Sequence, residues 1–332
     1  MIKGLLLLSL IYLLVTNSSI AKASPTPINV KNLNPIPFQL IKLKKAKKVF
    51  KKRKTVKVAI IDTGIDLNHS FFKNSLGKKK KYSKNVLPQS IDLTHGQSSL
   101  SGDLNGHGTH VSGIIKSINP DIQIISIKFN NPKGKGKDNF NSLLRSYKLA
   151  IKMKVDIINY SGGGLKPYFK EFNLLKKAEK SNILLIAASG NQALNLDHKK
   201  NVYFPASYKL NNIISVAAHD NNSKILPFSN FGKNSVHLMA PGFKIIGPMP
   251  GNKFGEMTGT SQATAFVTGV ASLLISHFPS LRPSQIKEIL INSSLKRGPT
   301  TIAHKHVMGG KLDAFNAFKS ASRLTIKKSR EN

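Results

Sequence analysis

Short apolar runs alternate with amphipathic stretches along most of the chain. The apolar runs show no polar alternation, which is typical of parallel strands that are buried on both faces of a sheet. They are Val56–Ile61, Ile122–Lys128, Val155–Asn159, Ile183–Ala188 and Ile213–Ala217. The stretches between them, such as Asn139–Lys152 and Phe169–Lys180, have the length of crossover helices. This alternation predicts an α/β fold of three layers, with a mostly parallel, doubly wound sheet between helices.

Further helices are expected in the second half of the chain. One begins near Ser261 and is apolar nearly all round, which predicts that it is buried. A proline opens the next, Ser284–Asn292, and Leu312–Lys319 has the pattern of a terminal helix. We expect residues 321–332 to form a basic tail.

Polar and glycine residues follow three of the predicted strands. The first strand ends in Asp62, another leads into Ser161-Gly162-Gly163, and a third ends at Ser189-Gly190-Asn191. In open parallel sheets the active groups lie beyond the carboxyl ends of the strands. The sequence therefore directs attention to these three positions.

Two more segments carry reactive side chains at helix starts. His107 lies in Asn105-Gly106-His107-Gly108-Thr109-His110, and Ser261 lies in Gly259-Thr260-Ser261-Gln262. A serine at the N-terminus of a buried helix is near the positive end of the helix dipole, where developing negative charge is stabilised.

These segments together resemble the signature motifs of subtilisin-like serine proteases. Asp62-Thr63-Gly64, His107–Gly113 and Gly259-Thr260-Ser261 are similar to the three motifs and occur in the family's order. The resemblance covers about residues 56–318 and implies the subtilisin-like fold and a serine endopeptidase activity. A peptidase domain is accordingly expected over residues 56–320.

The resemblance also implies roles for single residues. Ser261 is expected to be the nucleophile, His107 the general base and acid, and Asp62 the group that orients His107. Asn191 matches the amide of the family's oxyanion hole. His110 is expected to be structural. A metal site formed by His107 and His110 would need a third ligand, and the sequence places none beside them.

The substrate-binding residues are expected to be Ser161, Gly162, Gly163 and Gly190. Glycine lets another backbone approach closely, so Ser161-Gly162-Gly163 can pair with an extended peptide. Residues 187–190, Gly162-Gly163 and Tyr203 are expected to line a neutral pocket for the residue before the scissile bond. Asp103 is expected to border the cleft and to favour a basic neighbour in the substrate.

Charge and composition narrow the classes of protein. The chain of 332 residues has 51 Lys and Arg against 15 Asp and Glu, a formal net charge of +36, and no cysteine. The absence of cysteine excludes disulfides, a thiol nucleophile and cysteine-ligated metal sites. The many lysines have two alternative explanations: the base composition of the gene, or selection for a positively charged surface. The positive charge favours anionic envelope or acidic polymers as partners besides the polypeptide substrate.

The N-terminus has the features of an export signal. Lys3 precedes the apolar run Leu5–Val15, and Ala21-Lys22-Ala23 offers a cleavage site, so residues 1–23 are expected to be a signal peptide. The alternative is an uncleaved anchor, although the run is shorter than the roughly 20 residues that span a bilayer. We expect a secreted, periplasmic or cell-envelope protein.

Residues 24–55 are expected to form an arm that is first Pro-rich and then strongly basic. With 32 residues, it is shorter than the roughly 40 residues that usually fold alone. A short pro-segment lying across the enzyme surface and a solvated arm are both consistent with this composition.

Several features speak against other cofactors and partners. Phe71 stands about where the family has a calcium-binding carboxylate, and few acids are present, so we expect no essential cofactor or metal. No nucleic-acid motif occurs, since the basic stretches lack interleaved aromatic residues. We expect a monomer. The alternative function is a catalytically silent protein of the same fold that binds anionic polymer through its basic surface.

Overall fold

The computed structural model describes residues 33–74, 89–94, 102–295 and 305–331. The signal peptide expected at residues 1–23 and the first part of the arm lie outside this range.

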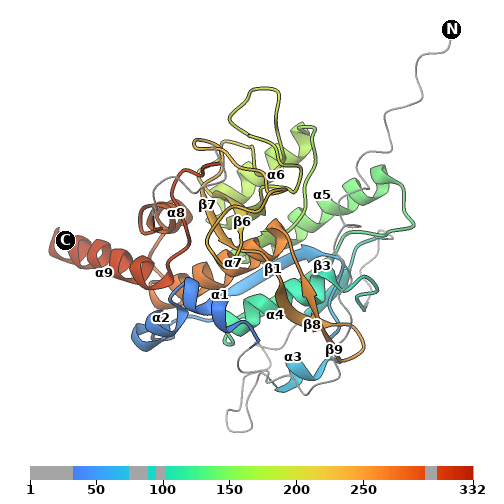
Figure 1. Cartoon of the computed structure of the whole chain (residues 1–332). Helices are drawn as coiled ribbons and strands as arrows, with labels where there is room; N and C mark the ends of the chain where they lie inside the picture. Colours follow the sequence, from blue (N-terminus) through green and yellow to red (C-terminus); the bar gives the residue numbers. More distant parts are fainter. Residues whose placement is uncertain (1–32, 75–88, 95–101, 296–304, 332) are drawn as a thin grey trace.

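A seven-stranded parallel sheet forms the centre of the molecule (Figure 1). Its strands lie in the order β2-β3-β1-β4-β5-β6-β7. The strands are β1 (Lys57–Asp62), β2 (Gln89–Asp92), β3 (Gln123–Lys128), β4 (Ile157–Tyr160), β5 (Leu184–Ala188), β6 (Ile213–His219) and β7 (Leu238–Pro241). All neighbouring pairs are parallel, as the uninterrupted apolar runs predict. The crossovers therefore place helices on the faces of the sheet.

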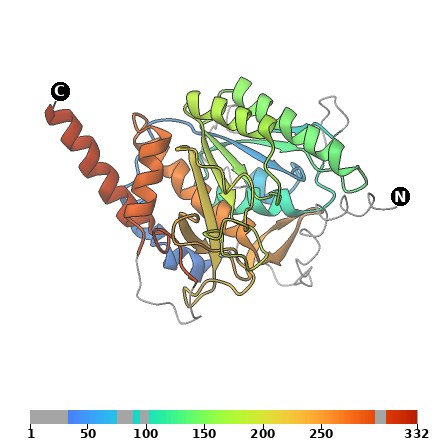
Figure 2. The same cartoon turned by 90° about the horizontal axis from the view of Figure 1, so that it is seen from above.

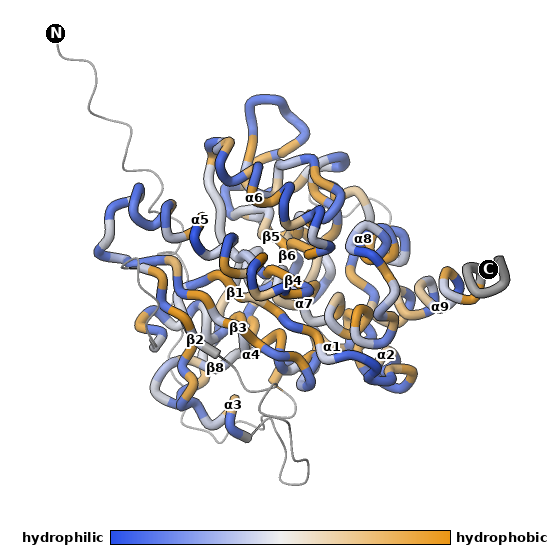
Figure 3. The backbone as a smooth tube through the Cα atoms, turned by 180° about the vertical axis from the view of Figure 1, so that it is seen from behind, coloured by the Kyte–Doolittle hydropathy of each residue, from blue (hydrophilic) through white to orange (hydrophobic). Residues whose placement is uncertain are grey.

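Both faces of the sheet are buried. Along β1, Val58 and Ile60 belong to one hydrophobic cluster, whereas Ala59 and Ile61 belong to the other, as the alternation of side chains in a strand requires. Helices α4 (His107–Ile118) and α7 (Thr260–His277) cover the first face, and α5 (Gly136–Lys152) and α6 (Phe169–Lys180) cover the second (Figure 2). The central strands are the most apolar part of the chain (Figure 3). The predicted three-layer α/β fold is confirmed.

Helix α7 crosses the middle of the first face. All of its residues are buried, as its uniformly apolar sequence predicts. It lies so close to α4 that a Cβ on Gly269 would be 2.7 Å from Cβ of Ile118. This packing holds the middle of α7 against the C-terminal end of α4.

A hairpin and a short helix lie beside α4. The hairpin consists of β8 (Ile245–Met249) and β9 (Lys253–Met257), and the helix is α3 (Ser70–Asn74). Phe71 is buried there against aromatic neighbours, with ring centroids 5.2 Å from Phe72 and 6.3 Å from Phe254. The position at which the family resemblance suggests a carboxylate therefore belongs to an apolar aromatic cluster.

The second half of the basic segment is part of the folded body. It forms α1 (Pro35–Leu40) and α2 (Leu43–Val49), and the side chains of Ile41 and Ala46 are fully buried. The lysines of α2 stay exposed on its other side; they are Lys44, Lys45, Lys47 and Lys48. The segment thus differs from a solvated arm, because its few apolar residues share one side of a helix.

Asn34 anchors this segment. It is 3% exposed and pairs with both backbone groups of Ile246 on β8: its Nδ2 donates to the carbonyl at 2.7 Å, and its Oδ1 accepts from the N–H at 2.9 Å. Phe38 packs on Phe266 of α7 with ring centroids 5.9 Å apart.

An N-terminal and a C-terminal segment of the described chain lie side by side. Helix α8 (Pro283–Asn292) precedes α9 (Ala314–Glu331), which packs against α2 (Figure 1). The N–H of Ala314 donates to the carbonyl of Ile41 at 2.9 Å, and Lys42 forms an ion pair with the buried Asp313. Helix α9 continues through most of the stretch that we expected to be a basic tail. No helix in the described part of the chain combines the length and the apolarity needed to cross a membrane.

Candidate active site

Asp62 and His107 meet at the carboxyl edge of the sheet. Asp62 is the last residue of β1 and is 4% exposed, and His107 is the first residue of α4. The Oδ1 atom of Asp62 lies 2.7 Å from Nδ1 of His107 and also accepts the N–H of Thr63 at 2.8 Å. The carboxylate therefore holds the imidazole through one nitrogen and leaves Nε2 for another partner.

The surroundings of His107 act on its charge in opposite directions. Burial disfavours the cation, but the charge and hydrogen bond of Asp62 and the charge of Asp103 outweigh this effect. The pKa of His107 is consequently raised above its ordinary value.

Asp103 is buried beneath the start of α4. Its Oδ1 accepts hydrogen bonds from Thr63 Oγ1 at 2.9 Å and from the N–H groups of Asn105 and Gly106 at 3.0 and 2.8 Å. Its Oδ2 accepts from the N–H and the hydroxyl of Thr109 at 2.9 and 2.7 Å. At 3% exposure it does not border a cleft, so the expectation that it contacts substrate is wrong. Asp103 instead fixes the turn that presents His107.

Ser261 is the second residue of α7 and is 8% exposed. Its hydroxyl donates to the carbonyl of Ser161 at 3.0 Å, and the hydroxyl of Ser161 donates to the carbonyl of Ser261 at 3.3 Å. Among the hydrogen bonds of the described residues, none joins Ser261 to His107. The first N–H groups of a helix have no hydrogen-bond acceptor within the helix. The N–H of Ser261, the second residue of α7, is one of these groups.

Asn191 lies against the start of α7. Its Oδ1 accepts from the N–H and the hydroxyl of Thr260 at 3.1 and 2.9 Å, which orients its Nδ2 donor. An atom at the Cβ position of Gly259 would be 3.4 Å from Asn191 Nδ2 and 3.8 Å from Ser261 N. The same position would be 3.1 Å from Oε1 of Gln262. The amide of Asn191 and the N–H of Ser261 therefore lie near one another at the start of α7.

Asn230 fixes the loop that carries Asn191, and the sequence did not single it out. It is fully buried, and its Oδ1 accepts the N–H groups of Gln192 and Leu194 at 3.0 and 2.9 Å. Its Nδ2 donates to the carbonyl of Ser189 at 2.7 Å and to Oε1 of Gln192 at 2.8 Å. Its one sequence signal is an amide between two phenylalanines, in Phe228-Ser229-Asn230-Phe231.

Comparison with known proteins identifies the family. The profile of the Subtilase family of peptidases matches residues 53–309. The chain belongs to the subtilase family. It is therefore a serine-type endopeptidase. The major intracellular serine protease of Bacillus subtilis is 31% identical over 237 residues, which are 68% of this chain and 70% of that protein.

Other subtilases show the same likeness. Subtilisin DY of Bacillus licheniformis is 30% identical over 278 residues, which are 80% of this chain and 92% of that protein. Among solved structures, a lanthipeptide protease has a similar fold, with a TM-score of 0.70 at 24% identity over 88% of this chain and 97% of that one.

The glycines expected to bind substrate in this subtilase lie against tyrosines. A Cβ on Gly162 would be 3.1 Å from Cζ of Tyr160, and a Cβ on Gly163 would be 2.3 Å from Cε1 of Tyr203. Gly190 has φ +102°, a conformation that favours glycine. The structure therefore brings Ser161, these glycines and Ser261 into one region.

Two other histidines of the subtilase are structural. His69 is fully buried, with Nε2 2.7 Å from the carbonyl of Lys253. His110 is fully buried, with Nε2 2.9 Å from the carbonyl of Ile245, and burial followed by the charge of His107 lowers its pKa to about 4. The expectation of a structural His110 is confirmed. The described residues contain no group of three or more His, Cys, Asp or Glu that could hold a metal ion.

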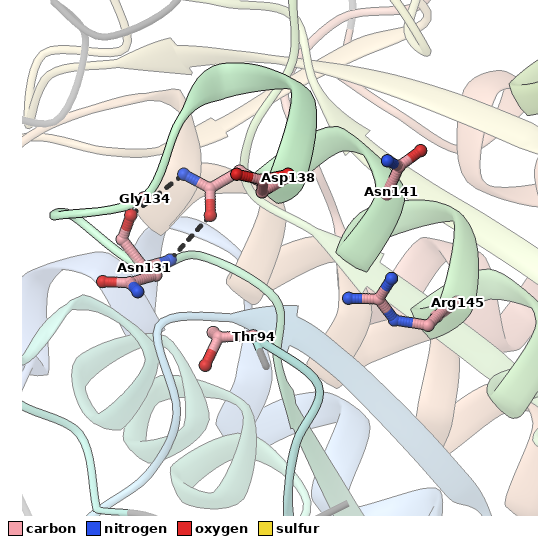
Figure 4. A pocket seen from close by; sticks show the side chains of 7 residues that line it. Thr94, Asn131, Gly134, Asp138, Asn141 and Arg145 are labelled. Carbon is pink, nitrogen blue, oxygen red and sulfur yellow. Dashed lines mark hydrogen bonds between the residues drawn. The ribbon is translucent and has the colours of Figure 1, made fainter. Parts of the chain in front are cut away.

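A separate hollow of about 380 Å³ lies beyond the ends of β2 and β3 (Figure 4). Asn131 and Asn139 bond to one another across its rim at 2.9 and 3.0 Å, and Arg145 donates to the carbonyl of Leu93 at 2.7 Å. The hollow contains none of the site residues that the sequence predicts.

Proposed function

We propose that this subtilase is an exported endopeptidase that cleaves polypeptides through an acyl-enzyme at Ser261. The observation that carries the proposal is the Asp62–His107 pair, 2.7 Å between Oδ1 and Nδ1, at the end of β1. The neighbouring strand β4 leads into Ser161, whose carbonyl accepts the hydroxyl of Ser261.

The residues act in two half-reactions. The Oγ of Ser261 attacks the scissile carbonyl carbon while Nε2 of His107 takes the hydroxyl proton and then gives it to the leaving amine. Next, His107 takes a proton from water, whose oxygen attacks the acyl carbon, and the proton passes from His107 to Oγ of Ser261 as the ester bond breaks and the peptide carboxylate leaves. Asp62 keeps His107 in the required tautomer and stabilises its cation.

Two features of the site bear on the first step. The Ser261 hydroxyl exchanges its acceptor from the Ser161 carbonyl to His107 by rotating about χ1, since catalytic hydrogen bonds often tighten only with substrate bound. The Nδ2 of Asn191 and the N–H of Ser261 then donate to the oxyanion. Ser161, Gly162 and Gly163 pair with the substrate backbone in an extended strand.

Export is the second part of the proposal. The relatives include a protease named as intracellular, so this part rests on the N-terminal sequence: Lys3, the apolar run Leu5–Val15 and Ala21-Lys22-Ala23. We place removal of the signal after Ala23. Residues from Leu33 onward stay in the mature enzyme, because their removal would expose the buried surface beneath α1 and α2.

Calcium is not required for folding in this proposal. The aromatic cluster around Phe71 leaves no carboxylate where the family resemblance suggests one, and a calcium site needs six to eight oxygen ligands. We expect the melting temperature of the purified protein to change by less than about 2 °C when excess EDTA is added. A drop of many degrees that calcium reverses would contradict this.

The surface charge suggests further contacts. The exposed lysines of α2 and a net charge of +36 favour anionic envelope or acidic polymers, and we propose that the enzyme acts as a monomer. A catalytically silent protein that only binds such polymers is the competing function.

One experiment separates enzyme from binding protein. Purified mature chain and Ser261→Ala are treated with a fluorophosphonate probe at pH 8 and then incubated with casein. Labelling and cleavage that both disappear in Ser261→Ala support the proposal. A correctly folded chain that neither labels nor cleaves casein, yet is retained on an anionic polymer, supports the competing function.

A further inference from the structure

The proposed pairing of substrate with Ser161-Gly162-Gly163 sets the direction of the substrate side chain next to the scissile bond. Ser261 lies between two segments, since its hydroxyl bonds to Ser161 and the neighbouring Thr260 bonds to Asn191. A peptide paired with Ser161-Gly162-Gly163, with its carbonyl oxygen near Asn191, directs that side chain into the gap between Gly163 and Gly190.

The ring of Tyr203 occupies this gap. A Cβ on Gly163 would be 2.3 Å from Cε1 of Tyr203, and a Cβ on Gly190 would be 2.9 Å from Cδ2. These atoms lie on opposite edges of the phenol ring, so the ring spans the distance from one segment to the other. The missing side chains of the two glycines make room for Tyr203, which is 5% exposed.

The backbone around Tyr203 is held in place. Its N–H donates to Oγ of Ser207 at 2.9 Å, and its carbonyl accepts the N–H of Ser207 at 2.8 Å. The next residue, Phe204, exchanges two backbone hydrogen bonds with Gly164, at 2.9 and 2.7 Å. A large substrate side chain would have to displace a ring whose own backbone is fixed on both sides.

We infer that Tyr203 closes the primary specificity pocket, so that this protease cleaves after small residues such as alanine, glycine or serine. The inference rests on the proposed function and refines its substrate class. It goes beyond the neutral pocket expected from the sequence, in which Tyr203 was one lining residue among several and no preferred side chain was named.

The test compares four peptide p-nitroanilides that differ only in the last residue: Ala, Leu, Phe or Lys. Rates are divided by the active-site concentration, measured with the fluorophosphonate probe, so that incomplete folding of a variant does not affect them. We expect kcat/KM for the alanyl substrate to exceed that for the phenylalanyl substrate by at least ~10-fold in the wild type, because overfilling a pocket is discriminated on this scale.

Two variants examine the cause. Tyr203→Gly removes the ring and should lower the Ala-to-Phe ratio of kcat/KM by ~10-fold or more. Tyr203→Phe keeps the ring and loses only the hydroxyl, so it should retain the wild-type ratio. Unchanged preference in Tyr203→Gly, or equal loss in both variants, would overturn the inference.

The wild type alone offers a second measurement. Mass spectrometry of casein fragments should show cleavage mainly after Ala, Gly and Ser. Frequent cleavage after Phe, Leu or Tyr by a chain that labels with the probe would overturn the inference and leave the proposed function intact. Absence of labelling would overturn the proposed function and this inference with it.

Discussion

At the scale of single residues, the charge on Asp62 governs the protonation of His107. Asp62 is buried and His107 is mostly covered, and without the carboxylate the burial that disfavours the cation would dominate. Activity requires neutral His107, so a raised pKa places the acid limb of the pH profile above ~6.5, the ordinary histidine value.

We therefore expect Asp62→Asn to have two effects. The kcat should fall by about 10⁴-fold, the size of this change in other serine proteases. The acid limb of kcat/KM should move to lower pH, because the group that raises the pKa is gone. Asp66→Asn is the matched control, since within the described part of the chain Asp66 accepts backbone N–H groups, from Asn68 at 2.9 Å and Gly251 at 3.0 Å, and does not contact His107. An acid limb that does not move in Asp62→Asn would contradict this account.

Asn230 offers a prediction about positioning. Asn230→Ala leaves the N–H groups of Gln192 and Leu194 without their acceptor and frees the loop that carries Asn191. We expect kcat to fall by ~10-fold or more with little change in KM, as part of the ~10²–10³-fold that a lost oxyanion donor costs. In an Asn191→Ala background the same change should leave kcat nearly unaltered.

The control for Asn230 is another buried asparagine. Asn212 is 1% exposed, and its side chain donates to the carbonyl of Ile183 at 2.8 Å. It lies at the amino ends of β5 and β6, opposite to the carboxyl ends that carry the site. Asn212→Ala should lower stability without lowering kcat. Equal losses of kcat from Asn230→Ala with and without Asn191 would show that Asn230 does not act through the amide.

At this scale the sequence predicted those residues whose type and surrounding motif indicate a chemical role. Asp62, His107 and Ser261 stood in recognisable motifs, and the structure places the first two in contact. Asp103 and Asn230 were misjudged or missed because their roles arise from burial, which spacing along the chain does not reveal. Tyr203 was expected to line the pocket, but its direction depends on two segments that are far apart in sequence.

At the scale of elements, the N-terminal helices are held by Asn34. The side chain replaces two strand-like hydrogen bonds of Ile246, so Asn34→Ala leaves a buried N–H and a buried carbonyl unpaired. We expect a loss of about 1–3 kcal/mol in the free energy of unfolding, measured by urea denaturation of the Ser261→Ala protein.

A lysine of α2 provides the comparison. Lys44 is exposed, so Lys44→Ala in the same background should change the free energy of unfolding by less than about 0.5 kcal/mol. N-terminal sequencing should also find that the mature chain starts before Leu33. A fully active enzyme that starts after Val49 would contradict the retention of α1 and α2.

Most of the longer elements could be predicted, and most of the shorter ones could not. Phe169–Lys180 coincides with α6, and the five predicted strands are all present, with each end within two residues of the prediction. Strands β2 and β7 have four residues each and were not predicted, whereas β4, which is equally short, lies in the apolar run Val155–Asn159 and was. Helix α1 was hidden by its two prolines, and α2 by the lysines that surround its few apolar residues.

At the scale of the whole molecule, the chain has 51 basic residues against 15 acidic ones. The repulsion between the positive charges destabilises the folded state. Raising the ionic strength from about 0.01 M to about 0.15 M shortens the Debye length from about 30 Å to about 8 Å. We expect the melting temperature of Ser261→Ala to rise over this range. For the active enzyme, kcat/KM on acidic casein should fall while that on a neutral p-nitroanilide stays constant. A melting temperature that falls with salt would show that the described ion pairs outweigh the repulsion.

The contact between residues 41–42 and the start of α9 has a consequence for the resistance of this enzyme to self-digestion. A protease in concentrated solution is its own most abundant substrate, and frayed termini are where digestion usually starts. Here the segment after Leu40 and the start of α9 hold one another through the Ile41–Ala314 hydrogen bond and the Lys42–Asp313 ion pair. Unfolding of either segment would break these contacts, so resistance to self-digestion at this place depends on both segments at once.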